Sequence, residues 1–464
     1  MFSIDTYISR RTRLAASVEK GIILLMGNDE SPMNYADNTY HYRQDSSFLY
    51  FTGISHPGVA LVIDAETNEV TLFGDDYTID DIVWMGVQPT IASRAAKSGI
   101  NNTSPAASLK DVLQSALSKG RSVHYLPPYR AANREKLSAL FNTSVHEISD
   151  GASLELMKAV VNQRNYKTEE EIVEIEKAVN TTVEMHQAAM RMARPGMTEA
   201  QIAAEVTRIA QAAGGQLSFP VIATINGQTL HNHYHGNTLE QGKLFLLDCG
   251  AETAMGYAGD MSSTFPVGKT FTEEQKTFYN IALAAHNKAI SMLRPGIAFR
   301  EIHLEACRTI AQGMKDEGFL KGNVDDMVNQ GVHAMFFPCG LGHMMGLDVH
   351  DMEDLGEVWV GYDGEPKSTM FGLKSLRLGR KLEPGFVLTI EPGIYFIPDL
   401  MKKWHNENRF KEFINYDKLF RYKDFGGMRN EEDFLITEDG ARLLGKPLAK
   451  SVNEVEEERR KAFE

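Results

Sequence analysis

An internal repeat most constrains what this chain can fold into. The tripeptide R-P-G occurs at residues 194–196 and again at 294–296, and each copy is preceded and followed by a segment with helical periodicity. At the same offset, three further positions carry identical residues: Ile202, Glu205 and Arg208 match Ile302, Glu305 and Arg308. The pattern predicts two related halves, with a site in the cleft between them that draws ligands from both. A chance match over so few positions is the alternative.

Length and composition indicate a protein of two domains. The chain has 464 residues, of which 43% are hydrophobic, and this exceeds the usual domain size of roughly 100 to 200 residues. The formal charge of −14 argues against a nucleic-acid or anionic-membrane surface, since either partner needs clustered Lys and Arg. We therefore expect neither nucleic acid nor a membrane among its partners.

The cysteines and the N-terminal residues favour a cytoplasmic protein. Cys249, Cys307 and Cys339 are odd in number, widely spaced and without a C-x-x-C pair, so neither a disulfide framework nor a zinc ribbon is indicated. The first residues contain no apolar h-region, and the run Ile22–Met26 is too short to span a bilayer. That run instead predicts a buried strand.

The N-terminal part has the pattern of a small α/β unit, followed by a helix-rich part. The polar stretch 162–168 predicts the domain junction, which gives domains of residues 1–162 and 163–464. Strands are predicted at Ile22–Met26, Val59–Ile63, Val70–Phe73 and Val123–Leu126, and helices at Leu109–Leu117 and Asn133–Leu140. Capping boxes predict three later helix starts: Thr168 with Glu171, Thr198 with Gln201, and Thr272 with Gln275.

Four acids lie at the ends of apolar runs. Asp248 ends the run that begins at Leu244, and a predicted β-hairpin would bring it close to Asp260. Glu391 ends a second run, and Glu431 precedes a third. A carboxylate at the end of a buried strand costs several kcal/mol unless it is paired or bound to metal, and no Lys or Arg adjoins the first three in sequence. Metal is the economical partner, although any one of these acids alone could face solvent.

The segment 336–351, F-F-P-C-G-L-G-H-M-M-G-L-D-V-H-D, adds two histidines. His343 and His350 lie seven residues apart among three glycines that allow close backbone approach. Two such histidines could equally be hydrogen-bonded loop residues. Four carboxylates together with one imidazole, however, are the inventory that a two-metal hydrolase needs, and this favours His343 as a neutral ligand.

These motifs resemble a known family. The strings L-L-D-C-G-A-E, Y-A-G-D-M-S-S-T-F-P-V, H-M-M-G-L-D-V-H-D, L-T-I-E-P-G-I-Y and R-N-E-E-D-F-L-I-T are similar to those of the pita-bread Xaa-Pro metallopeptidases, aminopeptidase P and prolidase. Y-R-Q-D-S with F-T-G, in the region 42–53, resembles their N-terminal domain. The resemblance implies an α/β (α+β) architecture, with a creatinase-like N-terminal α/β domain followed by a pseudo-twofold pita-bread catalytic domain.

The resemblance also implies a dinuclear metal centre and a substrate class. Two divalent cations, usually Mn²⁺ with Zn²⁺, Co²⁺ or Fe²⁺ as alternatives, would be held by Asp248, Asp260, His343, Glu391 and Glu431. The enzyme would hydrolyse the Xaa-Pro bond of dipeptides or of peptides with proline in second position, and it would form a homodimer or homotetramer.

Catalytic and substrate-binding residues follow by the same comparison. Glu391 would accept a proton from the attacking water and pass it to the proline nitrogen, and His350 would contact the substrate carbonyl. His231, in an N-G-x-x-L-H string, is the expected second substrate-side histidine, with His233 and His235 as competitors. Arg429 would orient the site through ion pairing; the alternative is a surface salt bridge of little energetic value.

Two positions depart from the family pattern. Cys339 stands where many relatives carry a histidine four residues before the metal-binding one, and a thiol cannot offer the same charged donor. Ser263 stands where an arginine is common. Neither change removes an expected metal ligand.

The choice between dipeptidase and aminopeptidase depends on how the far end of the substrate is recognised. A dipeptidase must bind the proline carboxylate, best by a bidentate arginine, and Arg377 lies in a segment that resembles the prolidase one; a solvated charge is the alternative. The insert 398–425 also resembles prolidase. Aminopeptidase P activity on longer peptides is the alternative function, and a metal-free binding scaffold is the alternative of another class. Methionine aminopeptidase is disfavoured by the N-terminal domain.

Overall fold

The computed structural model describes residues 1–464, and the chain divides into two compact units. Unit 1 consists of Met1–Arg164 and Met352–Trp359, and unit 2 of Asn165–Asp351 and Val360–Glu464. The segment Met352–Trp359 is therefore grouped with the N-terminal unit. A single division of the chain between residues 162 and 163 does not describe this grouping. No helix combines the length and the apolar composition that a membrane span requires.

Unit 1 is built on a mixed five-stranded sheet of order β6-β5-β4-β1-β7. Its strands are β1 Ile22–Met26, β4 Ala60–Asp64, β5 Val70–Phe73, β6 Asn102–Ser104 and β7 Val123–Tyr125, and a separate hairpin joins β2 Pro32–Tyr35 to β3 Asn38–Thr39. The helices are α1 Ile4–Val18, α2 Ser46–Thr52, α3 Ile79–Met85, α4 Ile91–Lys97, α5 Leu109–Ser118, α6 Ala131–Phe141, α7 Val145–Asp150 and α8 Leu154–Arg164. The predicted strands and helices are confirmed within one or two residues at each end.

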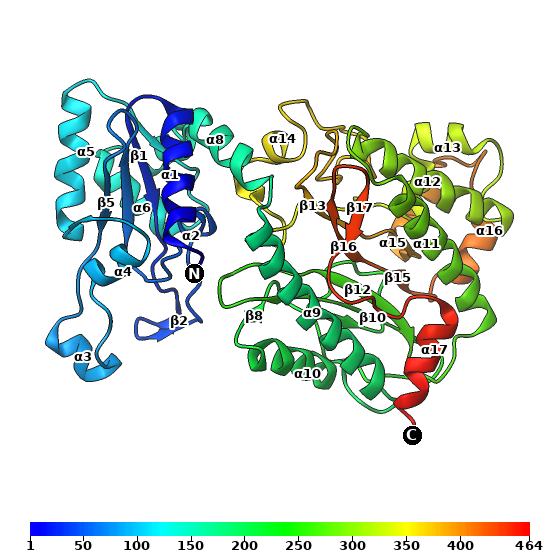
Figure 1. The fold of residues 1–464 in the computed structure, drawn as a ribbon. Helices are drawn as coiled ribbons and strands as arrows, with labels where there is room; N and C mark the ends of the chain where they lie inside the picture. The colour runs from blue at the N-terminus through cyan, green and yellow to red at the C-terminus, as the bar shows by residue number, and fades with distance from the viewer. The chain divides into compact units, whose positions relative to one another are not determined.

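Alternation along β1 explains why this sheet is covered on both faces. Ile22 and Leu24 pack with Leu109 and Leu113 of α5 in one core cluster, and Ile23 is fully buried on the opposite side of the strand. Figure 1 shows α1 and α5 on opposite sides of the sheet. A strand that is buried on both faces has a continuous apolar sequence, and the run Ile22–Met26 predicts β1 for this reason.

Unit 2 consists of long helices around short sheets. The helices are α9 Glu169–Met192, α10 Glu199–Ala212, α11 Glu273–Met292, α12 Phe299–Asp316, α13 Val324–Gln330, α15 Pro398–Asn406, α16 Tyr416–Leu419 and α17 Val452–Lys461, with α14 Glu357–Val360 at the boundary of the units. The strands are β8 Gln216–Leu217, β9 Ile222–Thr224, β10 Leu244–Cys249, β11 Ala251–Glu252, β12 Met261–Pro266, β13 Val387–Ile390, β14 Gly393–Tyr395, β15 Gly427–Arg429, β16 Glu432–Ile436 and β17 Ala441–Leu443. All three predicted capping boxes form, at Thr168, Thr198 and Thr272.

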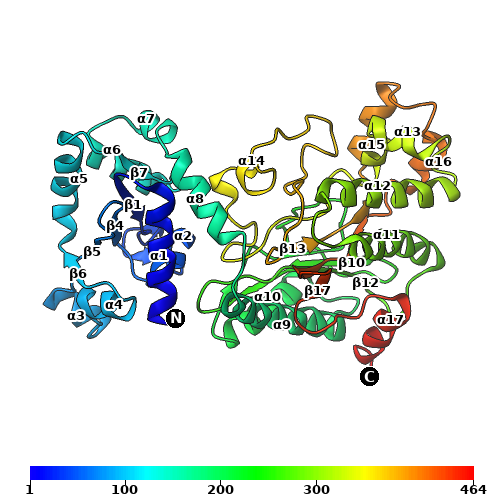
Figure 2. The same cartoon turned by 45° about the horizontal axis from the view of Figure 1, so that its top comes forward.

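The sequence repeat corresponds to a structural repeat within unit 2. The N–H of Gly196 donates to the carbonyl of Leu239 at 2.9 Å, and the N–H of Gly296 donates to that of Leu382 at 2.8 Å. Both glycines have positive φ, 91° and 84°, which explains why each R-P-G ends in glycine. Figures 1 and 2 show β10, β12 and β13 between the helix pair α9–α10 and the pair α11–α12. The prediction of two related halves is confirmed.

The repeat also places the acids equivalently. Asp248 lies nine residues after Leu239 in the first half, and Glu391 lies nine residues after Leu382 in the second. Asp260 immediately precedes β12, and Glu431 immediately precedes β16. Each half therefore contributes one carboxylate at or just beyond the end of one strand and one at the start of the strand that pairs with it.

Candidate metal centre

Strand pairing brings the four acids to one region of unit 2. Strand β10 pairs antiparallel with β12, so that Asp248 lies opposite Ser262, and β13 pairs antiparallel with β16. The N–H of Glu431 donates to the carbonyl of Ser262 at 3.0 Å, which joins the two sheets. The predicted hairpin between Asp248 and Asp260 is thus present, with the short strand β11 in its connection.

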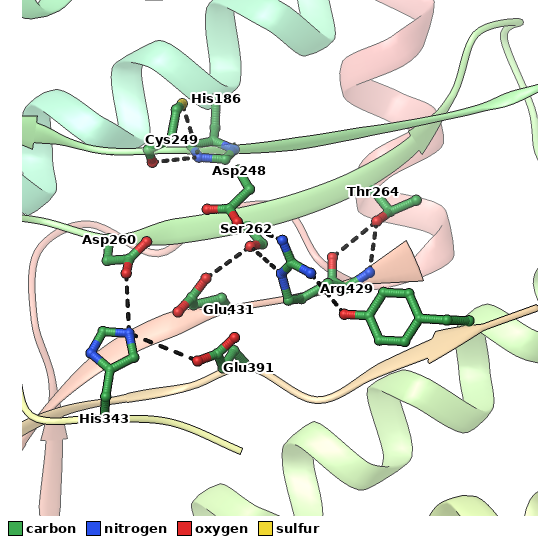
Figure 3. Close-up of polar contacts among 11 residues, drawn as sticks. His186, Asp248, Cys249, Asp260, Ser262, Thr264, His343, Glu391, Arg429 and Glu431 are labelled. Carbon is green, nitrogen blue, oxygen red and sulfur yellow. Dashed lines mark hydrogen bonds and ion pairs between the residues drawn. The ribbon is translucent and has the colours of Figure 1, made fainter. Parts of the chain in front are cut away.

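His343 lies among these carboxylates. Its Nε2 is 3.3 Å from Asp260 Oδ2 and 3.8 Å from Glu391 Oε1 (Figure 3). One donor atom from each of Asp260, His343 and Glu431 lies within 4.8 Å of the other two, and all three residues are buried. Two oxygens and one nitrogen converge here from segments far apart in sequence.

The backbone fixes which nitrogen of His343 faces the acids. Its Nδ1 lies 3.0 Å from the carbonyl of Met344 and must carry a proton to donate to it. The lone pair is then on Nε2, the atom that faces Asp260 and Glu391. Two contacts with Thr389 hold the backbone of His343: its N–H donates to the Thr389 hydroxyl at 3.2 Å and its carbonyl accepts from the Thr389 N–H at 3.0 Å.

The electrostatics of the cluster call for a cation. Burial, and then the charge of Asp248, raise the pKa of Asp260 well above its usual range, and burial followed by Asp260 does the same to the pKa of Glu431. Burial also raises the pKa of Glu391 to about 7. Oδ1 of Asp248 and Oδ1 of Asp260 are buried without a hydrogen-bond partner. The oxygen and nitrogen donors with these unpartnered atoms fit a divalent metal, whose binding would release protons.

Arg429 is a cationic partner of Asp248 that the local sequence does not reveal. No basic residue adjoins Asp248 in sequence, but the buried guanidinium of Arg429 reaches it, with Nη2 2.5 Å from Oδ2. Arg429 also donates from Nε to the Ser262 hydroxyl at 2.9 Å and from Nη1 to the Tyr395 hydroxyl at 2.8 Å. The expected ion pair is therefore buried rather than on the surface, and it leaves Oδ1 of Asp248 for another partner.

Ser262 was missed in the sequence and links two of the acids. It accepts the hydrogen bond from Arg429 and donates to Glu431 Oε2 at 2.8 Å (Figure 3). Its place opposite Asp248 in the register of β10 and β12 is the signal that could have identified it. The chain Asp248, Arg429, Ser262, Glu431 fixes both carboxylates without using all their oxygen atoms.

The expected substrate-side residues surround the same cluster. The ring of His350 lies 4.3 Å from that of His343. The pKa of His231 is lowered, first by partial desolvation and then by Arg429, with smaller effects of His350 and Arg377. Arg377 also acts on His343. Of the competitors of His231, His235 places Nε2 3.0 Å from the carbonyl of Val221, and His233 is exposed, as is His231 itself.

The two departures from the family pattern lie in different places. Cys339 is at the site: burial raises its pKa to about 12, and the charge of Glu391 acts in the same direction. Ser263 follows Ser262 on β12 and points to the other face of the strand, where its hydroxyl lies 2.7 Å from Nδ1 of the buried His186. His186, which the sequence did not single out, also contacts the carbonyl of Cys249 at 3.3 Å and supports β10 from behind.

Comparison with known proteins establishes the family. Residues 173–438, more than half of the chain, match the model of metallopeptidase family M24. The chain belongs to this family. As an M24 metallopeptidase it is a hydrolase that depends on divalent metal, and residues 7–125 match the N-terminal domain of aminopeptidase P. The resemblance drawn from the sequence motifs and the predicted fold class are both confirmed.

The relatives of this M24 protein are named either as Xaa-Pro dipeptidases or as Xaa-Pro aminopeptidases. The protein is 30% identical to human Xaa-Pro dipeptidase, over 94% of this chain and 88% of that protein, and 30% identical to Xaa-Pro aminopeptidase of Escherichia coli, over 96% of each. Among solved structures, it resembles a variant of E. coli aminopeptidase P in complex with substrate, with a TM-score of 0.82, 29% identity and coverage of 100% of this chain and 99% of that one. A zinc-substituted form of the same protein in complex with product gives a TM-score of 0.81, 28% identity and 99% coverage of each chain.

Proposed function

We propose that the protein is an Xaa-Pro exopeptidase that cleaves the bond before proline at the N-terminus of peptides. The convergence of four carboxylates with His343 is the observation that carries the proposal. The relatives named Xaa-Pro dipeptidase and Xaa-Pro aminopeptidase, each matched over nearly the whole chain, support the substrate class. A metal-free scaffold would have no use for three buried carboxylates and a fourth, Glu391, that is partly exposed beside them, so we do not favour it.

The proposed centre holds two divalent cations, with Mn²⁺ as the first candidate. Asp248, Asp260, His343, Glu391 and Glu431 would be the ligands, because four carboxylates balance the charge of two such cations. When bound, the cations polarise the substrate carbonyl and lower the pKa of water, which supplies a nucleophile at neutral pH.

The protein's own groups orient the substrate and move the proton. Glu391 is the least buried of the four acids, with 22% of its side chain exposed, and it would accept the proton of the attacking water and deliver it to the proline nitrogen. His350 would donate to the oxyanion that develops at the carbonyl, and His231 would hold the substrate from the other side. Arg429 positions Asp248 and does not need to touch the substrate.

We further propose a preference for dipeptides. Arg377 acts electrostatically on both His231 and His343, which supports a position near the substrate, where its guanidinium could bind the proline carboxylate in bidentate fashion. Aminopeptidase activity on longer peptides is the second candidate, favoured by the close likeness to aminopeptidase P structures along the entire chain. A cytoplasmic location and a homodimer or homotetramer complete the proposal; cell fractionation and light scattering test them.

The function is tested by comparing three substrates with the wild-type protein in added Mn²⁺. We expect rapid hydrolysis of Gly-Pro, slower hydrolysis of Gly-Pro-Ala and none of Gly-Ala. Removal of the metal by a chelator should abolish all activity, and added Mn²⁺ should restore it. Equal rates on Gly-Pro and Gly-Ala would contradict proline specificity, and a faster tripeptide would favour the aminopeptidase.

Replacing Arg377 by alanine tests the dipeptidase preference. A hydrogen-bonded charge pair contributes roughly 1.5 to 3 kcal/mol, so kcat/KM for Gly-Pro should fall by about ten- to a hundredfold, while Gly-Pro-Ala should change little. Lys374→Ala, an exposed basic residue of the same segment, is the matched control and should change neither rate. Equal losses on the dipeptide and the tripeptide in Arg377→Ala would remove the argument.

A further inference from the structure

A second buried cluster of potential metal ligands lies outside the carboxylate centre. His303 and Cys307 are one turn apart on α12, and His333 lies on the 3₁₀ helix Val332–Met335. One donor atom from each lies within 4.8 Å of the other two, and all three residues are 0% exposed. The Cys307 sulfur is 3.4 Å from His303 Nε2, and the two imidazole ring centres are 6.4 Å apart.

Three of the four imidazole nitrogens of this cluster lack partners. Nδ1 of His303 and both ring nitrogens of His333 are buried without a hydrogen bond. Burying an unpaired polar atom destabilises the folded state unless a ligand binds to that atom. Burial lowers the pKa of His303 to about 3 and that of His333 to about 4, so both rings are neutral. The neutral imidazole is the form that ligates metal.

We propose that His303, Cys307 and His333 form a second metal site, selective for a soft d¹⁰ cation such as Cu⁺ or Zn²⁺. One thiolate and two imidazoles are soft and borderline donors, in contrast to the oxygen-rich centre at Asp260. Binding would break the S–H bond of Cys307, form a sulfur–metal bond and release one proton to solvent. His303 and Cys307, four residues apart on one helix, present their donors on the same face.

Charge favours the monovalent ion. The charged side chains that act on the cluster are Arg300, on His303, and Arg308, on Cys307, and both are cationic. A Cu⁺ ion with one thiolate gives a neutral site, whereas Zn²⁺ leaves one positive charge buried close to these arginines. The probes must therefore include one ion of each charge.

A metal bound to this cluster would connect two elements of unit 2 that lead to the carboxylate centre. The 3₁₀ helix that carries His333 leads directly into the segment 336–343, which ends at His343. The ring of His303 packs on Phe337 of that segment, with 5.5 Å between ring centres, and Cys339 lies near enough to influence Cys307. A metal here would tie α12 to the segment that delivers His343.

Two probes applied to the full-length protein test the site. Co²⁺, as a stand-in for Zn²⁺, should give a near-ultraviolet thiolate-to-cobalt charge-transfer band, which the carboxylate–histidine centre cannot produce because it has no sulfur ligand. Cu⁺, added without oxygen beside a Cu⁺ chelator, should be retained at one equivalent per chain. A stronger response to one probe identifies the charge of the ion.

Three variants make the result specific. Cys307→Ser should lose the charge-transfer band and the retained equivalent, and His333→Phe, which keeps the volume of the ring, should do the same. Cys339→Ser, which removes the neighbouring thiol, should keep both signals. Circular dichroism and thermal unfolding of each variant report whether the protein is folded. Absence of both signals in the wild type, their persistence in Cys307→Ser, or their loss in Cys339→Ser would overturn the proposal.

Discussion

Asp260→Ala is expected to abolish hydrolysis of Xaa-Pro substrates while leaving the protein folded. Asp260 Oδ2 is the carboxylate oxygen nearest to His343 Nε2, at 3.3 Å, and loss of this proposed ligand should remove several kcal/mol of transition-state stabilisation, a fall in kcat of about 10³-fold or more. Folding should persist because the variant removes a buried carboxylate that lacks a hydrogen-bond partner at Oδ1. Steady-state kinetics and metal analysis of the purified variant measure the effect.

A matched variant separates this effect from a change in net charge. Glu438→Ala removes one exposed carboxylate from the turn that follows β16 and should retain full activity and metal content. The outcome that would refute the ligand assignment is an Asp260→Ala protein that binds two equivalents of Mn²⁺ and turns over at the wild-type rate.

Lys167→Met is expected to destabilise unit 2 by about 3 to 5 kcal/mol, since it removes a cation from a buried carboxylate. Lys167 Nζ lies 2.9 Å from Asp351 Oδ2, and both side chains are 1% exposed. Asp351 in turn donates its backbone N–H to the carbonyl of Met344 at 2.9 Å, which closes the loop between His343 and His350. Thermal unfolding should therefore occur at a lower temperature, and activity should fall because His350 loses its fixed position.

The reason for such a large effect is how tightly the pair is enclosed. A Cβ added at Gly346 would lie 2.7 Å from Asp351 Oδ2 and 2.9 Å from the Lys167 side chain, so the pair is packed directly against the backbone at Gly346. The double variant Lys167→Met with Asp351→Asn removes both charges and keeps the acceptor for the Asp348 N–H, 3.3 Å away. It should recover most of the lost stability; failure to recover would show that packing rather than charge is responsible.

Local sequence patterns predicted the parts of this protein that depend on neighbours in the chain. The capping box at Thr168 needs two residues three apart, and β5 was predicted with the correct bounds because apolar alternation and its flanking turns are local signals. The candidate metal ligands could also be predicted, since each of these acids and His343 lies beside apolar residues in the sequence. These local features are sufficient to predict the fold class and the family.

Contacts between distant segments could not be read in this way. Arg429 neutralises Asp248 across 181 positions, and only the adjacency of β12 and β15 to β10 brings them together. The grouping of Met352–Trp359 with the N-terminal unit has no compositional signal. The cluster of His303, Cys307 and His333 could not be predicted either, because His333 lies far along the chain from the other two and joins them only in the folded structure.

The equivalent placement of the acids in the two halves of unit 2 has a thermodynamic consequence. Neither half has more than two of the four carboxylates, so a complete ligand sphere exists only while both halves are folded against each other. Bound cations would therefore cross-link the two halves, and the free energy of metal binding would add to the free energy of unfolding. We expect a metal-depleted protein to unfold in separate, broader steps, and a loaded one to unfold as a single cooperative body whose midpoint rises with the concentration of free Mn²⁺.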